Sequence, residues 1–194
     1  MLPHLSREFF TRPTLHVAKE LLGARLVHLE NGQRLAGWIT EAEAYIGEAD
    51  QGCHARAGRT PRTAVMYGPP GHAYVYFTYG VHWCLNAVTE REGFPAAVLI
   101  RAIEPVEGTE IMLQRRNGRD TYGPGKLAQA LGIDGMLNGV DLCTQESGLW
   151  IEAGKPVPDT DLVTGPRVGL YSVPEPWKSI PWRFRVPLQK AVVE

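Results

Sequence analysis

Two carboxylates and a tyrosine alternate in the segment Thr40-Glu41-Ala42-Glu43-Ala44-Tyr45. If this segment is a β-strand, alternate side chains share a face, so Glu41, Glu43 and Tyr45 point the same way. At a rise of about 3.3 Å per residue, the two carboxylates would lie roughly 6–7 Å apart. Such a pair suits a two-carboxylate glycosidase, or a single catalytic carboxylate beside an aromatic pocket wall. A solvated strand edge with two incidental acids is the plain alternative.

The stretch between Asp50 and Glu90 contains 39 residues and no acidic side chain. It holds Arg56, Arg59 and Arg62, three of the six histidines and four of the seven tyrosines. Of the 20 basic residues in the chain, 15 are arginines, which grip phosphates with two donors and stack on flat rings. This composition indicates a polyanionic partner with flat rings, and a tyrosine-rich hairpin with a chance charge bias is the alternative.

A run of aromatic residues, Tyr74-Val75-Tyr76-Phe77-Thr78-Tyr79-Gly80, ends in a glycine typical of a hairpin bend. Strand alternation predicts that Tyr74, Tyr76 and Thr78 share one face, with Tyr79 on the other. A large aromatic side chain at a turn has few core neighbours and is free to insert into a partner. Ordinary packing of tyrosines across a sheet is the alternative.

Several kinds of active site are excluded by missing motifs. The three cysteines include no C-x-x-C pair, which argues against a disulfide framework and a zinc ribbon. The motifs of zinc deaminases and of G-x-S-x-G hydrolases are also missing. The segment Gly123-Pro124-Gly125-Lys126-Leu127 lacks the first glycine and the Ser or Thr of a phosphate loop, so it is interpreted as a turn that opens a helix. Neither a metal nor a cofactor is expected.

The length of 194 residues and the 44% hydrophobic content indicate one globular domain over residues 1–194. No apolar run approaches a membrane span, and the start shows no basic leader before an apolar stretch. A cytoplasmic, nucleoid-associated protein that does not bind membranes is therefore expected. The net charge of −1 argues against a generic cationic coat for nucleic acid.

The elements that must position these residues are mostly strands. Their apolar patterns and turn residues predict an α+β fold with a mainly antiparallel sheet and several short helices. The predicted strands are Ala24–Leu29, Arg34 to about Tyr45, His72–Tyr79, Val81–Val88, Ala96–Ala102, Val168–Tyr171 and Trp182–Val186. The predicted helices are Leu15–Leu22, Glu107–Arg116 and Gly125–Leu131, and a long loop covers Gly47–Pro70, a length that is often functional.

An ordered set of short motifs runs through nearly the whole chain, from about Thr14 to Val186. The set comprises Glu43-Ala44-Tyr45, His54, Tyr76-x-x-Tyr79-Gly80, Asn86, the run Leu99-Ile100-Arg101-Ala102-Ile103-Glu104-Pro105, Gly123-Pro124-Gly125-Lys126-Leu127 and Arg167-Val168-Gly169. Each motif is weak alone, but in this order they resemble the alkyladenine-type 3-methyladenine DNA glycosylases, the alkylpurine or methylpurine DNA glycosylase family.

The resemblance implies a monomeric base-excision repair enzyme that flips damaged purines out of double-stranded DNA and hydrolyses their N-glycosidic bond. Its family substrates are 3-methyladenine, 7-methylguanine, hypoxanthine and ethenoadenine. It also implies a curved antiparallel sheet with several short helices.

Roles for individual residues follow from the resemblance at matching positions. Glu43 is similar to the general base that activates water, with Arg101 and the Val168 carbonyl helping to hold that water. Tyr45, His54 and Tyr76 resemble the walls of the base pocket. Asn86 resembles the group that crowds the amine of normal guanine, and Tyr79 the wedge that fills the gap left by the flipped nucleotide. Two departures are the residues Val81-His82 after the wedge, where larger apolar groups are expected, and the low net charge.

The residues themselves add two expectations. A strand-cleaving glycosylase needs an amine nucleophile, yet the five lysines (19, 126, 155, 178 and 190) lie outside the region from Glu43 to Arg101, and Met1 is not followed by proline. Hydrolysis without lyase activity is therefore expected. Arg56, Arg59 and Arg62 are expected to hold DNA phosphates, with Arg115, Arg116 and Arg119 as further candidates. A nucleic-acid-binding module without catalysis remains the alternative to an enzyme.

Overall fold

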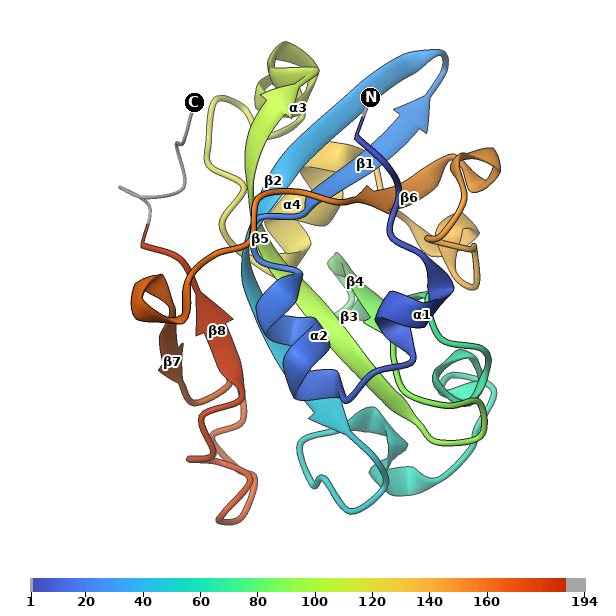
Figure 1. Ribbon diagram of the computed structural model, residues 1–194, viewed down its shortest axis with the longest axis vertical. Coiled ribbons are helices and arrows are strands. Elements are labelled where there is room, and N and C mark those ends of the chain that lie inside the picture. The colour runs from blue at the N-terminus through green and yellow to red at the C-terminus, as the bar shows by residue number, and fades with distance from the viewer. Residues whose placement is uncertain (1, 188–194) are drawn as a thin grey trace.

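The computed structural model describes residues 2–187, so Met1 and Lys190 lie outside the described residues. The described strands all join one antiparallel sheet in the order β3-β4-β5-β2-β1-β6, with β8 paired to β2 and β7 paired to β8 (Figure 1). The strands are β1 (Arg25–Glu30), β2 (Gln33–Ile46), β3 (Ala73–Thr78), β4 (His82–Val88), β5 (Ala96–Glu107), β6 (Leu149–Glu152), β7 (Val163–Gly165) and β8 (Arg183–Arg185). The helices are α1 (Arg7–Phe10), α2 (Thr14–Glu20), α3 (Thr109–Arg115) and α4 (Pro124–Leu131), and short 3₁₀ helices lie in the loops before β3, β6 and β7.

One segment ties the two ends of the curved sheet together. The backbone of residues 139–142 bonds to Gly71 and Ala73 at the start of β3, and the Leu142 carbonyl accepts from Ile151 of β6. The outermost strands of the order β3-β4-β5-β2-β1-β6 are thus brought towards each other. This confirms the expected α+β fold with a curved antiparallel sheet.

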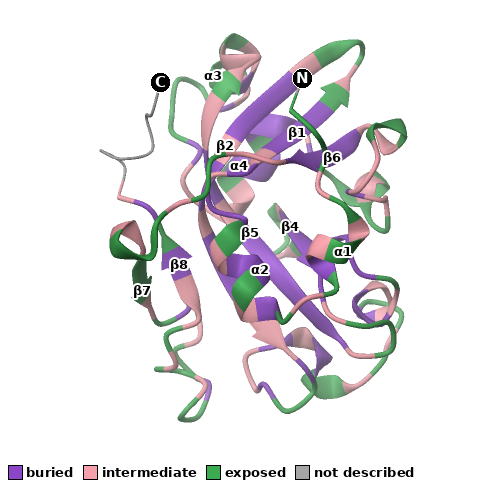
Figure 2. Ribbon diagram, viewed as in Figure 1, coloured by how far each residue is buried: buried purple, intermediate pink, exposed green. Residues whose placement is uncertain are grey.

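The core lies on the concave side of the sheet, where α2 and α4 pack against the long strands. Val17 and Ala18 of α2 and Leu127 and Leu131 of α4 belong to the same buried cluster as the inward-facing residues of β2 and β5. Figure 2 shows this purple layer running along β2 and β5, while the segments at the edges are green. The two longest strands therefore carry Glu41, Glu43, Tyr45 and Arg101 on a rigid support.

Most predicted elements are confirmed, with shifts at their ends. The strand predicted for Ala96–Ala102 continues to Glu107, so the following helix begins at Thr109. The long loop contains two 3₁₀ helices, His54–Ala57 and Ala64–Tyr67. The prediction of a strand at Val168–Tyr171 is wrong, because Gly169 has a φ of 84° and the segment turns. Helix α1 and strands β6 and β7 were not predicted.

Strand β2 is irregular at Glu41, the first of the two glutamates. Its register against β5 shifts between Ile39 and Glu41, and again between Glu41 and Ala42. Over the same residues β2 also pairs with β8, which places Glu43 opposite Arg183. Bulges next to active sites often re-aim a side chain, and this one lies at the first carboxylate of the pair.

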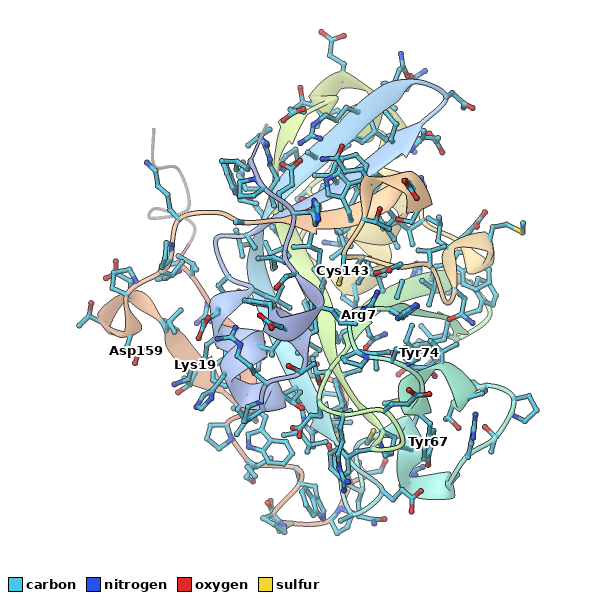
Figure 3. All side chains as sticks on the ribbon, turned by 45° about the vertical axis from the view of Figure 1, so that its right-hand side comes forward. Arg7, Lys19, Tyr67, Tyr74, Cys143 and Asp159 are labelled. Atoms are coloured by element: carbon cyan, nitrogen blue, oxygen red, sulfur yellow. The ribbon has the colours of Figure 1, made fainter. Side chains whose placement is uncertain are left out.

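Helix α2 and the segment before β7 lie on the opposite side of the molecule from the long loop. Figure 3 shows Lys19 and Asp159 on one side, near α2 and β7, and Tyr67 and Tyr74 on the other, beside the long loop. Among the described residues, no helix is long and apolar enough to cross a membrane.

Candidate active site

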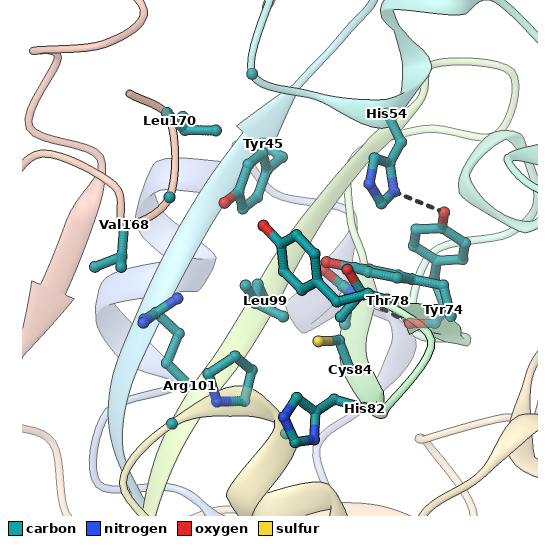
Figure 4. Close-up of a pocket in the computed structure, with 18 of the residues that line it drawn as sticks. Tyr45, His54, Tyr74, Thr78, His82, Cys84, Leu99, Arg101, Val168 and Leu170 are labelled. Carbon is teal, nitrogen blue, oxygen red and sulfur yellow. Dashed lines mark hydrogen bonds between the residues drawn. The ribbon is translucent and has the colours of Figure 1, made fainter. Parts of the chain in front are cut away.

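A pocket of about 370 Å³ opens between the β3–β4 hairpin, the loop before the first 3₁₀ helix and the turn at residues 168–170. Figure 4 shows His54 and Tyr74 on one side of it, Val168 and Leu170 on the other, and Arg101 at its far end. Six residues predicted for the site line the pocket. They are Tyr45, His54, Tyr76, Asn86, Arg101 and Val168. Tyr79 lines it too, at the hairpin turn.

Glu43 is completely buried behind this wall, and three of the wall residues donate to its carboxylate. The Val168 backbone N–H donates to Oε1 at 2.7 Å, and the Tyr45 hydroxyl donates to Oε2 at 2.8 Å. Arg101 Nη1 reaches Oε2 at 3.4 Å, while its Nε donates to Glu41 at 2.9 Å. Arg101 contacts both Glu41 and Glu43, and Tyr45 donates to Glu43, so the predicted common face of the strand is confirmed.

The charge of Glu43 is only partly compensated by these donors. Burial raises the pKa of Glu43, and the lowering effects of Arg101, the Val168 N–H and the Tyr45 hydroxyl do not cancel it. A buried carboxylate with a raised pKa is a stronger base than an exposed one, and such groups are concentrated at functional sites. Glu41 differs, because it is partly exposed and lies between Arg101 and Arg183. Glu41 is thus an ion-pair partner of Arg101 and Arg183.

The aromatic walls are fixed by contacts with one another. The His54 ring lies edge-on to Tyr76, with centroids 4.5 Å apart, and its Nδ1 shares a hydrogen bond of 3.0 Å with the Tyr74 hydroxyl. Tyr74 in turn tilts against Tyr76 at 5.3 Å. Beneath them, a separate small core that includes Cys53, Met66 and Tyr74 supports Tyr45 and Tyr76. The walls are thus preorganised to receive a flat ring.

His54 is neutral at neutral pH. Burial, and then the positive charges of Arg62 and Arg56, lower the pKa of His54 to about 4. Its ring therefore adds no positive charge to the pocket.

Asn86 is held rigidly on the neighbouring strand. Tyr74 and Asn86 are cross-strand partners, and the Asn86 Nδ2 donates to the Tyr74 carbonyl at 2.9 Å. The side chain is buried and lines the pocket, so it restricts the shape of a ring that could enter.

Tyr79 lies in a backbone conformation that tyrosine seldom adopts. Its φ is 52°, the following Gly80 has a φ of 68°, and its side chain is 87% exposed. A non-glycine residue in the left-handed region costs free energy, and such costs are concentrated at functional sites. The prediction that Tyr79 lies on the face opposite Tyr76 is wrong: β3 ends at Thr78, and Tyr79, in the turn beyond it, lines the same pocket as Tyr76.

The three arginines predicted to contact DNA are all exposed around this hairpin and loop. Arg56 donates to the Gln51 carbonyl, Arg59 lies over the Tyr67 ring, and Arg62 lies over the Tyr76 ring at 5.3 Å. The further candidates are engaged elsewhere: Arg115 pairs with Glu30, Arg116 is buried against Gln129, and Arg119 donates to the Arg116 carbonyl.

Several residues of the site were missed by sequence reasoning. Tyr74 and Cys84 were within reach of the strand pattern, since they share the faces of Tyr76 and Asn86. The most important omission is Arg167, which was noted only as part of a motif. It is buried against Asp50 and lies between the rings of Tyr45 and Trp182. Within residues 2–187, no group of three His, Cys, Asp or Glu side chains is arranged to hold a metal ion.

Comparison with known proteins places this geometry in a context. A family model described as methylpurine-DNA glycosylase matches residues 8–190. A protein of Methanocella arvoryzae named "Putative 3-methyladenine DNA glycosylase" is 49% identical over 189 residues, covering 94% of this chain and 92% of the relative. A Myxococcus xanthus protein of the same name is 50% identical over 182 residues, covering 94% and 89%.

Proposed function

Because the chain belongs to the methylpurine-DNA glycosylase family, we propose that it excises alkylated or deaminated purines from double-stranded DNA by hydrolysis of the N-glycosidic bond. The observation that carries the proposal is the buried Glu43, whose pKa is raised and whose three donors all line one aromatic pocket. The proposed substrates are 3-methyladenine, 7-methylguanine, hypoxanthine and ethenoadenine.

Glu43 is the proposed general base. Loss of the base generates oxocarbenium character on the sugar, and a nearby carboxylate both stabilises this charge and aligns the attacking water. A water held between Arg101 and the Val168 carbonyl would lie next to the Glu43 carboxylate, since both residues already contact it. Only one carboxylate is required, which agrees with the role of Glu41 as a partner of Arg101.

The nucleotide must leave the helix before its glycosidic bond can be reached, which costs a few kcal/mol. Tyr79 is the proposed wedge that replaces the lost stacking, because it is the exposed aromatic group at the hairpin turn. Tyr45, His54 and Tyr76 are the proposed walls around the flipped base, and Asn86 the group that rejects the amine of guanine. Arg56, Arg59 and Arg62 are proposed to hold phosphates.

No lyase step is proposed. Among the described residues, Lys126 is the one lysine that lines the pocket, and its amine pairs with Asp120 at 2.9 Å. We further propose that the enzyme acts as a monomer.

The test is a set of duplex oligonucleotides that each carry one defined lesion, incubated with the protein and then treated with alkali. Alkali-dependent cleavage at the lesion supports hydrolysis without lyase activity. Cleavage without alkali would reveal a lyase. Binding of lesion DNA without any cleavage would instead favour the non-catalytic binding module.

A further inference from the structure

Asp50 and Arg167 form a completely buried ion pair beside the pocket. Arg167 Nη1 donates to Asp50 Oδ2 at 2.5 Å, and Nη2 donates to Oδ1 at 2.8 Å, so the pair is bidentate. The guanidinium lies 4.6 Å from the centroid of the Tyr45 ring and 5.1 Å from that of Trp182. Its Nε is buried with no hydrogen-bond partner among the described residues, an uncommon cost for a purely structural group.

The pair contacts three of the segments that carry the site. On β2, Arg167 Nη1 donates to the carbonyl of Ala44, the residue between Glu43 and Tyr45. In the loop that leads to His54, Asp50 accepts from the N–H groups of Ile46 and Gly52. In the C-terminal segment, Arg167 directly precedes Val168, whose N–H donates to Glu43.

Resting on the proposed function, we infer that Asp50 and Arg167 are positioning residues, which hold the Val168 N–H and the Tyr45 hydroxyl against Glu43. The segment at Val168 is a turn outside the sheet, so no strand pairing fixes the direction of its N–H. The adjacent buried guanidinium supplies that constraint. Trp182 completes the arrangement, because its carbonyl accepts from the Ala44 N–H while its ring covers Arg167.

Gly52 shows how closely the loop is fitted to Arg167. A Cβ atom at Gly52 would lie 2.6 Å from Leu170 Cδ1 and 2.9 Å from Arg167 Nη2. The backbone of Gly52 does not require glycine for its φ, so a substitution there acts through contact alone. Gly68 is a matched control, since its Cβ would meet nothing closer than the Val65 carbonyl at 3.3 Å.

The inference predicts a change in the pH profile of the reaction. The groups that face Glu43 are Arg101 of β5, Glu41 and Tyr45 of β2, the Val168 N–H, and Arg183 of β8 through Glu41. Two of these donors depend on the Asp50–Arg167 pair. If they move away, the carboxylate is less stabilised, and the acidic limb of the excision rate should shift to higher pH.

The experiment compares Arg167→Lys and Asp50→Asn with wild type in single-turnover excision from lesion DNA across pH, together with lesion affinity. A misplacement of about 1 Å in a site can cost about 100-fold, so we expect rates lowered by about 10- to 100-fold. Affinity should stay within about threefold, and the acidic limb should move up. Arg34→Lys, at a distant ion pair with the buried Glu152, is the control and should leave the rate and the acidic limb unchanged.

Wild-type rate and pH profile in folded Arg167→Lys and Asp50→Asn would overturn the inference. If circular dichroism shows that neither variant folds, the comparison of Gly52→Ala with its control Gly68→Ala decides the question. A lower rate with a shifted limb in Gly52→Ala alone supports positioning, and equal behaviour of the two glycine variants overturns it. The proposed function fails separately, through a wild-type protein that excises nothing or a Glu43→Gln variant that retains full activity.

Discussion

Two fully buried glutamates, Glu43 at the pocket and Glu152 at the far end of the sheet, have opposite protonation tendencies. Glu152 accepts from Arg25 at 2.7 Å, from Arg34 at 2.8 Å and from the Trp150 indole at 3.1 Å. Burial alone would raise the pKa of Glu152, but these donors outweigh burial and lower it. Glu43 has one arginine, more distant and shared with Glu41, and its pKa is raised.

The difference teaches that burial by itself does not decide the charge state of a carboxylate. The number and closeness of the donors that offset burial count as well. The donors around Glu152 more than offset the cost of burying its charge, so Glu152 remains ionised and holds β1 and β6 together. Glu43 is supplied with less positive charge, which leaves it basic, and that is the condition a general base requires.

The largest expected effect is on catalysis at Glu43. Glu43→Gln should keep lesion binding and lower the single-turnover excision rate by about 10²–10⁴, the usual contribution of general-base assistance. Glu152→Gln is the control and should leave the rate of the folded protein unchanged. Near wild-type cleavage by Glu43→Gln would remove Glu43 from the mechanism.

The second effect is on stability, where Glu152→Gln should be more damaging than Glu43→Gln. Glu152→Gln should lower the free energy of unfolding by about 3 kcal/mol, because it leaves two partly buried arginines with Glu107 as their remaining carboxylate. Glu43→Gln should be at least as stable as wild type, since it removes an under-compensated buried charge. Urea unfolding followed by fluorescence measures both, and equal losses in the two variants would contradict the comparison.

Truncation of the pocket wall or of the wedge should each cost about 1–3 kcal/mol of binding free energy, the value of one base–aromatic stack. The two truncations should act on different steps. Tyr76→Ala should change lesion preference more than flipping, because its ring packs against His54 inside the pocket. Tyr79→Ala should weaken binding and flipping more than preference. Fluorescence of 2-aminopurine beside the lesion reports flipping, and identical profiles for the two variants would sink this division.

The exposed arginines should contribute less to DNA affinity, and their contribution should depend on the salt concentration. Each phosphate contact changes the slope of log affinity against log salt by about −0.9, and we expect a total slope of roughly −3 to −5. The triple variant Arg56/Arg59/Arg62→Ala should reduce the magnitude of that slope and weaken lesion and undamaged DNA alike. If its affinity and slope match wild type, the DNA face lies on another loop.

The smallest effect is the pH dependence of stability. The folded pKa of Glu152 lies below its unfolded value, so its contribution is present above the unfolded pKa and is lost as pH falls through the folded pKa. The folded pKa of Glu43 is raised, so its ionisation costs stability as pH rises through that value. Unfolding midpoints between about pH 3 and 7 should therefore converge for wild type and Glu152→Gln at low pH. They should diverge for wild type and Glu43→Gln as pH rises.

Local patterns in the sequence determined the strands, the common face of Glu41, Glu43 and Tyr45, and the hairpin turn at Tyr79-Gly80. These features depend on neighbours within a few residues, where period and turn chemistry act directly. The ordered motifs likewise selected the residues that line the pocket, although they lie far apart along the chain.

Only the tertiary structure decided how basic Glu43 is and what holds it. Its donors come from β2, from β5 and from a turn more than a hundred residues later, and no local pattern reports the distance between them. The turn at Val168 was predicted as a strand because its apolar residues fit a strand pattern. In the structure its N–H donates to the distant carboxylate of Glu43 instead of to a neighbouring strand. For the same reason the sequence analysis assigned no role to Arg167. The function of a buried cation depends on its partners, and Asp50, Tyr45 and Trp182 contact Arg167 only in the folded chain.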